Sequence, residues 1–279
     1  MNKSAQKAWF QDKDISLKKT TGFLLKFQIY KTWYYINSYL KKHIRIDNIN
    51  SIELGCGEGK ISILLGLLGV KTNLLDFNKD VLTRAQKIHS LFNLNPTTIK
   101  ADIIELDKNL LNNFDISVSL GLAEHFENDE RQKVINSHFN VLKENGISII
   151  WVPNSLAIFY RIAFFLRKKL ELWPKEIVEI PYSAFELKNR MRKAGFKNIM
   201  IYCDGSLFED FTYWIGENFK SLIKKIFNLQ NPPISIKEKE LNNKPNNILI
   251  KNPQAKYPTL FGKYFSYPLV GIGYKITKQ

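Results

Sequence analysis

The chain is poor in cysteine and has no long apolar run. Cys56 and Cys203 are its two cysteines among 279 residues, which excludes a disulfide framework and a zinc site made of cysteines alone. No stretch of about 18 apolar residues occurs, so we expect no membrane-spanning helix. The first residues also lack the apolar core of a signal peptide. From these absences we expect a soluble, cytoplasmic protein.

Charge is distributed unevenly along the chain. The formal net charge is +15, yet residues 46–154 hold 10 Lys and Arg against 14 Asp and Glu. The segments on either side of this acidic stretch are basic. This pattern is typical of a cofactor-binding core whose flanks meet an anionic partner. The alternative is that the basic residues serve solubility alone.

Short apolar segments alternate with helical patterns through most of the sequence. Strands are expected at residues 51–54, 71–76, 97–100, 114–119, 147–152, 197–203 and 268–276. Helices are expected at 61–68, 78–92, 128–145 and 183–194. The third has a stop signal at Asn145-Gly146, and the fourth starts with a capping box formed by Ser183 and Glu186. The alternation predicts an α/β fold with a parallel sheet. The carboxyl ends of its strands would form one edge, where such sheets bind ligands.

Two further segments have helical periodicity. Aromatic residues from Phe23 to Tyr34 recur at spacings of three and four, which predicts one buried helical face. Residues 156–173 are apolar and basic, and Ile158, Ile162, Phe165 and Leu166 would share one face of a helix. This second helix could form a lid over a hydrophobic bound molecule, contact an anionic membrane surface, or form a dimer contact. We favour the lid.

A glycine-rich turn follows the first strand. Gly55-Cys56-Gly57-Glu58-Gly59 leads directly into a helix, where free backbone N–H groups can approach a ligand. A nicotinamide site needs the pattern G-x-G-x-x-G, and Lys60 occupies the third glycine position. The spacing therefore argues against a nicotinamide oxidoreductase. Asp76 lies 21 residues after Gly55, which suits a carboxylate that binds ribose hydroxyls.

These residues resemble a known enzyme family. Glu53-Leu-Gly-Cys-Gly-Glu-Gly-Lys60 is similar to the first motif of class I S-adenosylmethionine-dependent methyltransferases, an acid and an apolar residue before G-x-G-x-G. Later matches are Leu75-Asp76, Ala101-Asp102, and the segments 114–121, 142–146 and 194–196. The resemblance covers residues 50–155 well, and 183–203 and the final strand loosely.

The family's fold is a Rossmann-like doubly wound sheet with helices on both faces. The resemblance implies seven strands in the order 3-2-1-4-5-7-6, with strand 7 antiparallel. It also implies a division into a helical N-terminal cap at 1–45 and a methyltransferase domain at 46–279. Insertions on the acceptor side of that domain are expected at about 155–182 and 204–262.

The resemblance implies S-adenosyl-L-methionine as the cofactor. Glu53 and the glycine loop would hold its methionine end, Asp76 its ribose and Asp102 its adenine. The implied cofactor-binding residues are Glu53, Leu54, Gly55, Cys56, Gly57, Asp76, Phe77, Asp102, Ile103, Ser119, Leu120 and Gly121. The two aspartates could instead be turn residues or helix caps.

His125 is the candidate catalytic residue. It follows the fourth strand and could deprotonate an acceptor hydroxyl or amine, or it could simply begin a helix. Quinone-pathway O-methyltransferases bind a divalent metal with a similar E-x-x-E-H run. Here Gly121 replaces the first glutamate of that run, so we expect no metal.

The sequence favours a small acceptor over a nucleic acid. Amino-methyltransferases of nucleic acids show Asn, Asp or Ser before Pro-Pro-aromatic after the fourth strand, whereas this chain has Ser119-Leu-Gly-Leu122. We therefore expect methyl transfer to oxygen or nitrogen of a small organic or lipid-like acceptor. The alternatives are an RNA- or membrane-associated methyltransferase and a cofactor-binding module without catalysis.

Overall fold

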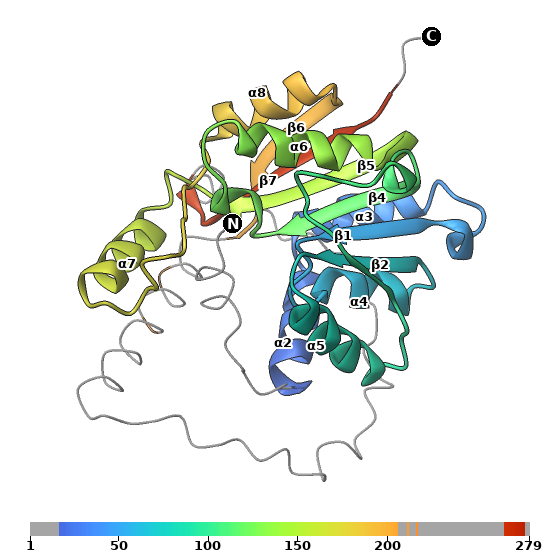
Figure 1. The fold of residues 1–279 in the computed structure, drawn as a ribbon, viewed down its shortest axis with the longest axis horizontal. Helices are drawn as coiled ribbons and strands as arrows, with labels where there is room; N and C mark the ends of the chain where they lie inside the picture. Colours follow the sequence, from blue (N-terminus) through green and yellow to red (C-terminus); the bar gives the residue numbers. More distant parts are fainter. Residues whose placement is uncertain (1–16, 206–210, 212–215, 217–264, 277–279) are drawn as a thin grey trace.

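The structure is a computed structural model that describes residues 17–205, 211, 216 and 265–276. A single seven-stranded sheet runs through it (Figure 1) in the order β3-β2-β1-β4-β5-β7-β6. The strands are β1 (Asn50–Leu54), β2 (Lys71–Asp76), β3 (Thr97–Lys100), β4 (Phe114–Leu120), β5 (Leu142–Pro153), β6 (Lys197–Cys203) and β7 (Pro268–Tyr274). β7 is antiparallel to β5 and β6, and the other pairs are parallel. The predicted strand order is confirmed.

Helices cover both faces of the sheet, as Figure 1 shows. The helices are α2 (Leu17–Phe27), α3 (Lys31–Leu40), α4 (Lys60–Leu67), α5 (Lys79–Ser90), α6 (Glu130–Asn140), α7 (Ile158–Lys169) and α8 (Ala184–Ala194). Short 3-10 helices are η1 (Ile46–Asn48), η2 (Lys108–Leu110) and η3 (Ala123–His125). α2, α3, α4 and α5 share one hydrophobic core with the sheet, while α6 and α8 pack in the core of the opposite face.

The central strands are buried on both faces, as parallel strands between two helical layers must be. In β5, Ile147 and Ile149 belong to the core beneath α2–α5, and Ile150 and Val152 belong to the core beneath α6 and α8. This burial fixes the register of the sheet, because a slip of one residue would exchange the two sets. The strand ends therefore have fixed positions.

The N-terminal helices depart from the sequence expectation. The predicted single face from Phe23 to Tyr34 is wrong, because α2 ends at Phe27 and a new helix starts four residues later, at Lys31. The carboxylate of Asp204, which follows β6, accepts hydrogen bonds from the first two backbone N–H groups of α3, each at 2.8 Å. It thus caps α3 from a distant part of the chain. Phe27 is consequently buried, while Tyr34 is 46% exposed.

The predicted helix at 128–145 is also too long. α6 ends at Asn140, and β5 begins at Leu142 rather than at Ile147. Asn145 has a positive φ of 65° inside β5, and its N–H donates to the carbonyl of Lys275 at 2.7 Å. The Asn145-Gly146 pair is therefore a bend within a strand, not a helix stop.

The structure describes the expected N-terminal cap and the second insertion only in part. The expected insertion at 204–262 lies mostly outside the described residues, as do residues 1–16 of the N-terminal segment. Among the described residues, we find no helix long and apolar enough to cross a membrane.

Candidate functional site

The glycine loop after β1 adopts a backbone conformation that favours glycine. Gly55, Gly57 and Gly59 have φ values of 59°, 53° and 67°, a region that side chains with a Cβ rarely adopt. The N–H of Cys56, within the loop, donates to the carbonyl of Leu75 at 3.0 Å. This bond holds the loop beside the end of β2.

The three glycines differ in what surrounds them. A Cβ at Gly55 would overlap the side chain of Leu122, and one at Gly59 would lie 2.6 Å from Nε2 of His89. A Cβ at Gly57 would meet no atom within 4 Å. The outer glycines therefore allow close packing inside the protein, whereas the backbone at Gly57 faces open space.

Asp76 joins the glycine loop to the start of α5. Its carboxylate accepts hydrogen bonds from the N–H of Gly57 at 3.4 Å and of Asn78 at 3.0 Å. The side chain is 7% exposed, and burial raises the pKa of its carboxyl above the usual value. The structure thus brings Asp76 and Gly57 together.

Asp102 lies at the end of β3, beside Asp76. The N–H of Ala101 donates to the carbonyl of Asp76 at 3.2 Å. Asp102 is exposed, and its carboxylate accepts from the N–H of Ile104 at 3.1 Å. It therefore forms a local turn and leaves the carboxylate accessible from solvent.

Other predicted cofactor residues point into the protein. The carboxylate of Glu53 is buried and accepts from the N–H of Ser62 in α4 at 2.8 Å, and burial raises its pKa to about 7. Ser119 is fully buried, with its hydroxyl 3.0 Å from Nε2 of His138 in α6. The side chains of Leu54, Cys56 and Ile103 are also buried, Leu120 and Phe77 are partly buried, and Gly121 has a positive φ of 73°. The buried residues can face the sheet edge only through their backbone.

A pocket of about 190 Å³ lies next to the end of β4. We call it the acceptor pocket. Gly121 and η3 form one side of it, and α7 and the segment that follows α7 form the other. Its lining residues are Gly121, Glu124, His125, Tyr160, Phe164, Arg167, Trp173, Glu179 and Tyr267.

His125 is fixed by a hydrogen bond across the pocket wall. Its Nδ1 lies 2.7 Å from the carbonyl of Val178. Since a carbonyl only accepts, Nδ1 carries the hydrogen. Burial lowers the pKa of the imidazole to about 4, despite the carbonyls of Val178 and Gly121. His125 is therefore neutral at pH 7 and a weak base.

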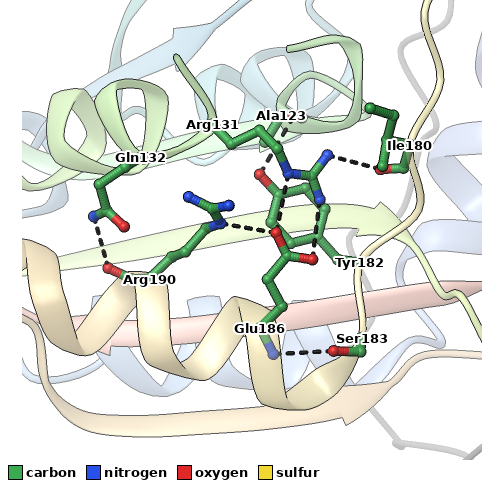
Figure 2. Close-up of polar contacts among 8 residues, drawn as sticks. All are labelled: Ala123, Arg131, Gln132, Ile180, Tyr182, Ser183, Glu186 and Arg190. Carbon is green, nitrogen blue, oxygen red and sulfur yellow. Dashed lines mark hydrogen bonds and ion pairs between the residues drawn. The ribbon is translucent and has the colours of Figure 1, made fainter. Parts of the chain in front are cut away.

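A partly buried ion pair anchors the segment between α7 and α8 (Figure 2). Arg131 of α6 donates to both carboxylate oxygens of Glu186 at 3.0 and 3.2 Å, and to the carbonyl of Ile180 at 3.0 Å. Its guanidinium also lies 3.7 Å from the ring centre of Tyr182, whose hydroxyl donates to the carbonyl of Ala123 in η3. Contacts with α6 and α8 therefore hold both η3 and the segment that follows α7, which line the acceptor pocket. Sequence reasoning missed Arg131, because no local pattern separates it from a surface arginine.

Only one half of the predicted capping box forms. The hydroxyl of Ser183 accepts from the N–H of Glu186 at 3.0 Å, as expected. The Glu186 carboxylate binds Arg131 and Arg190 rather than the backbone of Ser183.

The comparisons with known proteins agree with this geometry. A sequence model of a family described as a methyltransferase domain matches residues 46–198. The chain belongs to this family. It is a class I S-adenosylmethionine-dependent methyltransferase, a transferase whose cofactor is S-adenosylmethionine. Among curated proteins, none matches the chain in sequence.

Solved structures share the fold of this methyltransferase. A SAM-dependent methyltransferase from Archaeoglobus fulgidus is 15% identical with a TM-score of 0.50, over 86% of this chain and 93% of that one. A protein from Galdieria sulphuraria, provisionally assigned as a sarcosine dimethylglycine methyltransferase, is 14% identical with a TM-score of 0.55, over 88% and 84%. The [4+2]-cyclase SpnF is 14% identical with a TM-score of 0.54, over 87% and 80%. At these identities the likeness concerns the fold alone.

α7 has one face on the acceptor pocket and one in solvent. Tyr160 is buried and lines the pocket. The predicted apolar face is exposed: Ile158 by 54%, Ile162 by 46%, Phe165 by 64% and Leu166 by 38%. Contact of this face with an anionic membrane stays a prediction.

The described residues contain no group of three or more His, Cys, Asp or Glu that could hold a metal ion.

The open space at Gly57 leads to a prediction. In Gly57→Ala, the new methyl group would fill the space that a ligand of the loop needs, so affinity for S-adenosylhomocysteine should fall about tenfold or more. The left-handed conformation should also cost about 1 kcal/mol of unfolding free energy. Isothermal titration and denaturant unfolding measure the two effects.

Gly69→Ala is the matched control, since Gly69 has a φ of 92° and likewise nothing within 4 Å of an added Cβ. It should lose similar stability and retain the affinity. Equal affinity in both variants would show that no ligand approaches Gly57.

Proposed function

We propose that this methyltransferase holds S-adenosylmethionine along the ends of β1 to β4 and moves its methyl group to an oxygen or nitrogen of a small organic acceptor. The acceptor would occupy the acceptor pocket. One observation carries the proposal: Gly121 directly follows the end of β4 at the sheet edge and also lines the pocket. An acceptor beside Gly121 would lie next to the cofactor.

The residues at the sheet edge suit this cofactor. The backbone at Gly57 is open to a ligand, Asp76 offers a carboxylate for ribose hydroxyls, and Asp102 offers an exposed acceptor for the adenine amino group. Glu53 would act by holding the start of α4 in place, through its bond to Ser62. When bound, the cofactor supplies a methyl group on a positively charged sulfur.

The pocket favours a small acceptor. Its volume of about 190 Å³ is below the roughly 300–1,000 Å³ of pockets that bind drug-sized molecules. Aromatic side chains of Tyr160, Phe164 and Trp173 form much of its wall. They would exclude water from the reacting atoms and orient the acceptor, which is most of what such a displacement needs.

Methyl transfer can be followed without knowing the acceptor. The protein is incubated with methyl-labelled S-adenosylmethionine and a metabolite extract, and separately with RNA and with protein. We expect the label in small molecules, with its position on oxygen or nitrogen found by mass spectrometry. Label found in RNA or protein, and not in small molecules, would contradict the proposal.

His125 is the candidate for proton transfer or for positioning in this site. In His125→Ala, turnover should fall about 100-fold, while affinity for S-adenosylhomocysteine stays unchanged, since the residue lies on the acceptor side. Near-normal turnover would end any catalytic role for His125.

His125→Asn separates the two roles. An asparagine amide can replace Nδ1 as donor to the carbonyl of Val178 but cannot act as a base. Because burial lowers the pKa of His125 to about 4, we expect Asn to restore most of the turnover, as a positioning role requires. Equal loss in both variants would favour the general base.

A further inference from the structure

One carboxylate in the acceptor pocket lacks a partner for one of its oxygens. The side chain of Glu124 is 4% exposed and lines the pocket. Its Oε2 is buried and has no hydrogen-bond partner among the described residues. Buried carboxylate oxygens are nearly always hydrogen-bonded, because an unpaired one costs about 1–3 kcal/mol or more. The described part of the chain therefore supplies no hydrogen-bond donor to this oxygen.

A second carboxylate lines the same pocket. Oε1 of Glu179 accepts a hydrogen bond from the hydroxyl of Tyr160 at 2.5 Å. Burial raises the pKa of both glutamates, that of Glu124 well above its usual value, and each carboxylate raises the pKa of buried groups around it. Burial outweighs the attraction of Arg131 for Glu124 and that of Arg167 and Lys168 for Glu179.

The basic side chains nearby leave this pocket acidic. Arg167 is the one arginine or lysine among its described lining residues, which include the two glutamates. Lys168 is exposed and lies over the ring of Phe164. Arg131 is engaged by Glu186 and does not line the pocket. Arg131 and Lys168 attract Glu124 and Glu179 from outside the lining, and neither donates a hydrogen bond to Oε2 of Glu124.

The walls of the pocket suit the same kind of ligand. The faces of Tyr and Trp rings attract ammonium groups. Tyr160 lies in α7 and Trp173 in the segment that follows α7, and both residues line the pocket. Aromatic rings around a carboxylate bind a cationic nitrogen better than a neutral hydroxyl or an anion.

We propose that the acceptor is a small amine, bound as its ammonium ion with a hydrogen bond to Oε2 of Glu124 and with Glu179 nearby. The inference rests on the proposed function, since it names the acceptor class of the same pocket. If the acceptor is an amine, the methylated atom is nitrogen rather than oxygen.

Nitrogen must lose one proton before it can accept a methyl group. The N–H bond breaks, its electron pair becomes the nitrogen lone pair, and the proton forms an O–H bond at Oε2 of Glu124. A raised carboxyl pKa brings the proton affinity of Glu124 closer to that of an amine. His125 would hold η3 against the carbonyl of Val178 meanwhile.

Binding tests this proposal independently of turnover. The protein is first saturated with S-adenosylhomocysteine and then titrated by calorimetry with small primary amines from ethylamine to phenethylamine. Each amine is compared with the carboxylate that carries the same side group. We expect at least one amine to bind saturably and its carboxylate partner to bind more than about tenfold more weakly.

Variants locate the binding. Glu124→Gln should weaken the amine about 30-fold or more, since it removes one partner of a buried charge pair, and Glu179→Gln should weaken it less. Glu176→Gln, an exposed acid of the same segment, should change nothing. Affinity for S-adenosylhomocysteine should be the same in all four proteins.

Three results would overturn the inference: carboxylates that bind as tightly as their amines, a full panel in which no amine binds, or unchanged amine affinity in Glu124→Gln. Each leaves the proposed function standing as long as S-adenosylhomocysteine binds. If S-adenosylhomocysteine itself fails to bind, the proposed function fails, and this inference fails with it.

Discussion

The site depends on the backbone that joins the ends of β1 and β2. The N–H of Cys56 donates to the carbonyl of Leu75, and the carboxylate of Asp76 accepts from the N–H of Gly57. Both contacts need the loop to turn sharply, and glycines with positive φ allow that turn. They also need β1 and β2 in parallel register, which burial on both faces of the sheet enforces. The fold thereby places an open backbone segment beside a carboxylate.

The acceptor side is built in a different way. No strand end supplies Glu179, Tyr160 or Trp173, and their positions depend on side-chain contacts between distant segments. Arg131 is central to these contacts, since it binds Glu186, the carbonyl of Ile180 and the ring of Tyr182. The sheet edge is thus set by the fold, whereas the pocket depends on contacts between segments outside the sheet.

The sequence predicted those features that local signals encode. Apolar strands, glycine turns and the spacing of Gly55 and Asp76 are all local, so the alternation of strands and helices was accessible. The strand order followed from the family resemblance. The cap on α3 was not accessible, because its carboxylate belongs to Asp204, far along the chain. The early start of β5 was missed for a related reason, since Asn145-Gly146 is typical of helix ends and of bends alike. No sequence pattern indicates that Glu124 and Glu179 line one pocket.

The central claim is that the carboxylate of Asp76 and the glycine loop hold S-adenosylmethionine at the sheet edge. The most direct measurement is calorimetric titration of S-adenosylhomocysteine into the parent protein and into Asp76→Ala, with Asp80→Ala, an exposed acid of the first turn of α5, as control. The account predicts saturable binding by the parent and the control, and affinity about tenfold or more lower in Asp76→Ala, because a charged hydrogen-bond acceptor is lost. No saturable binding by the parent, or equal affinity in Asp76→Ala, would contradict it.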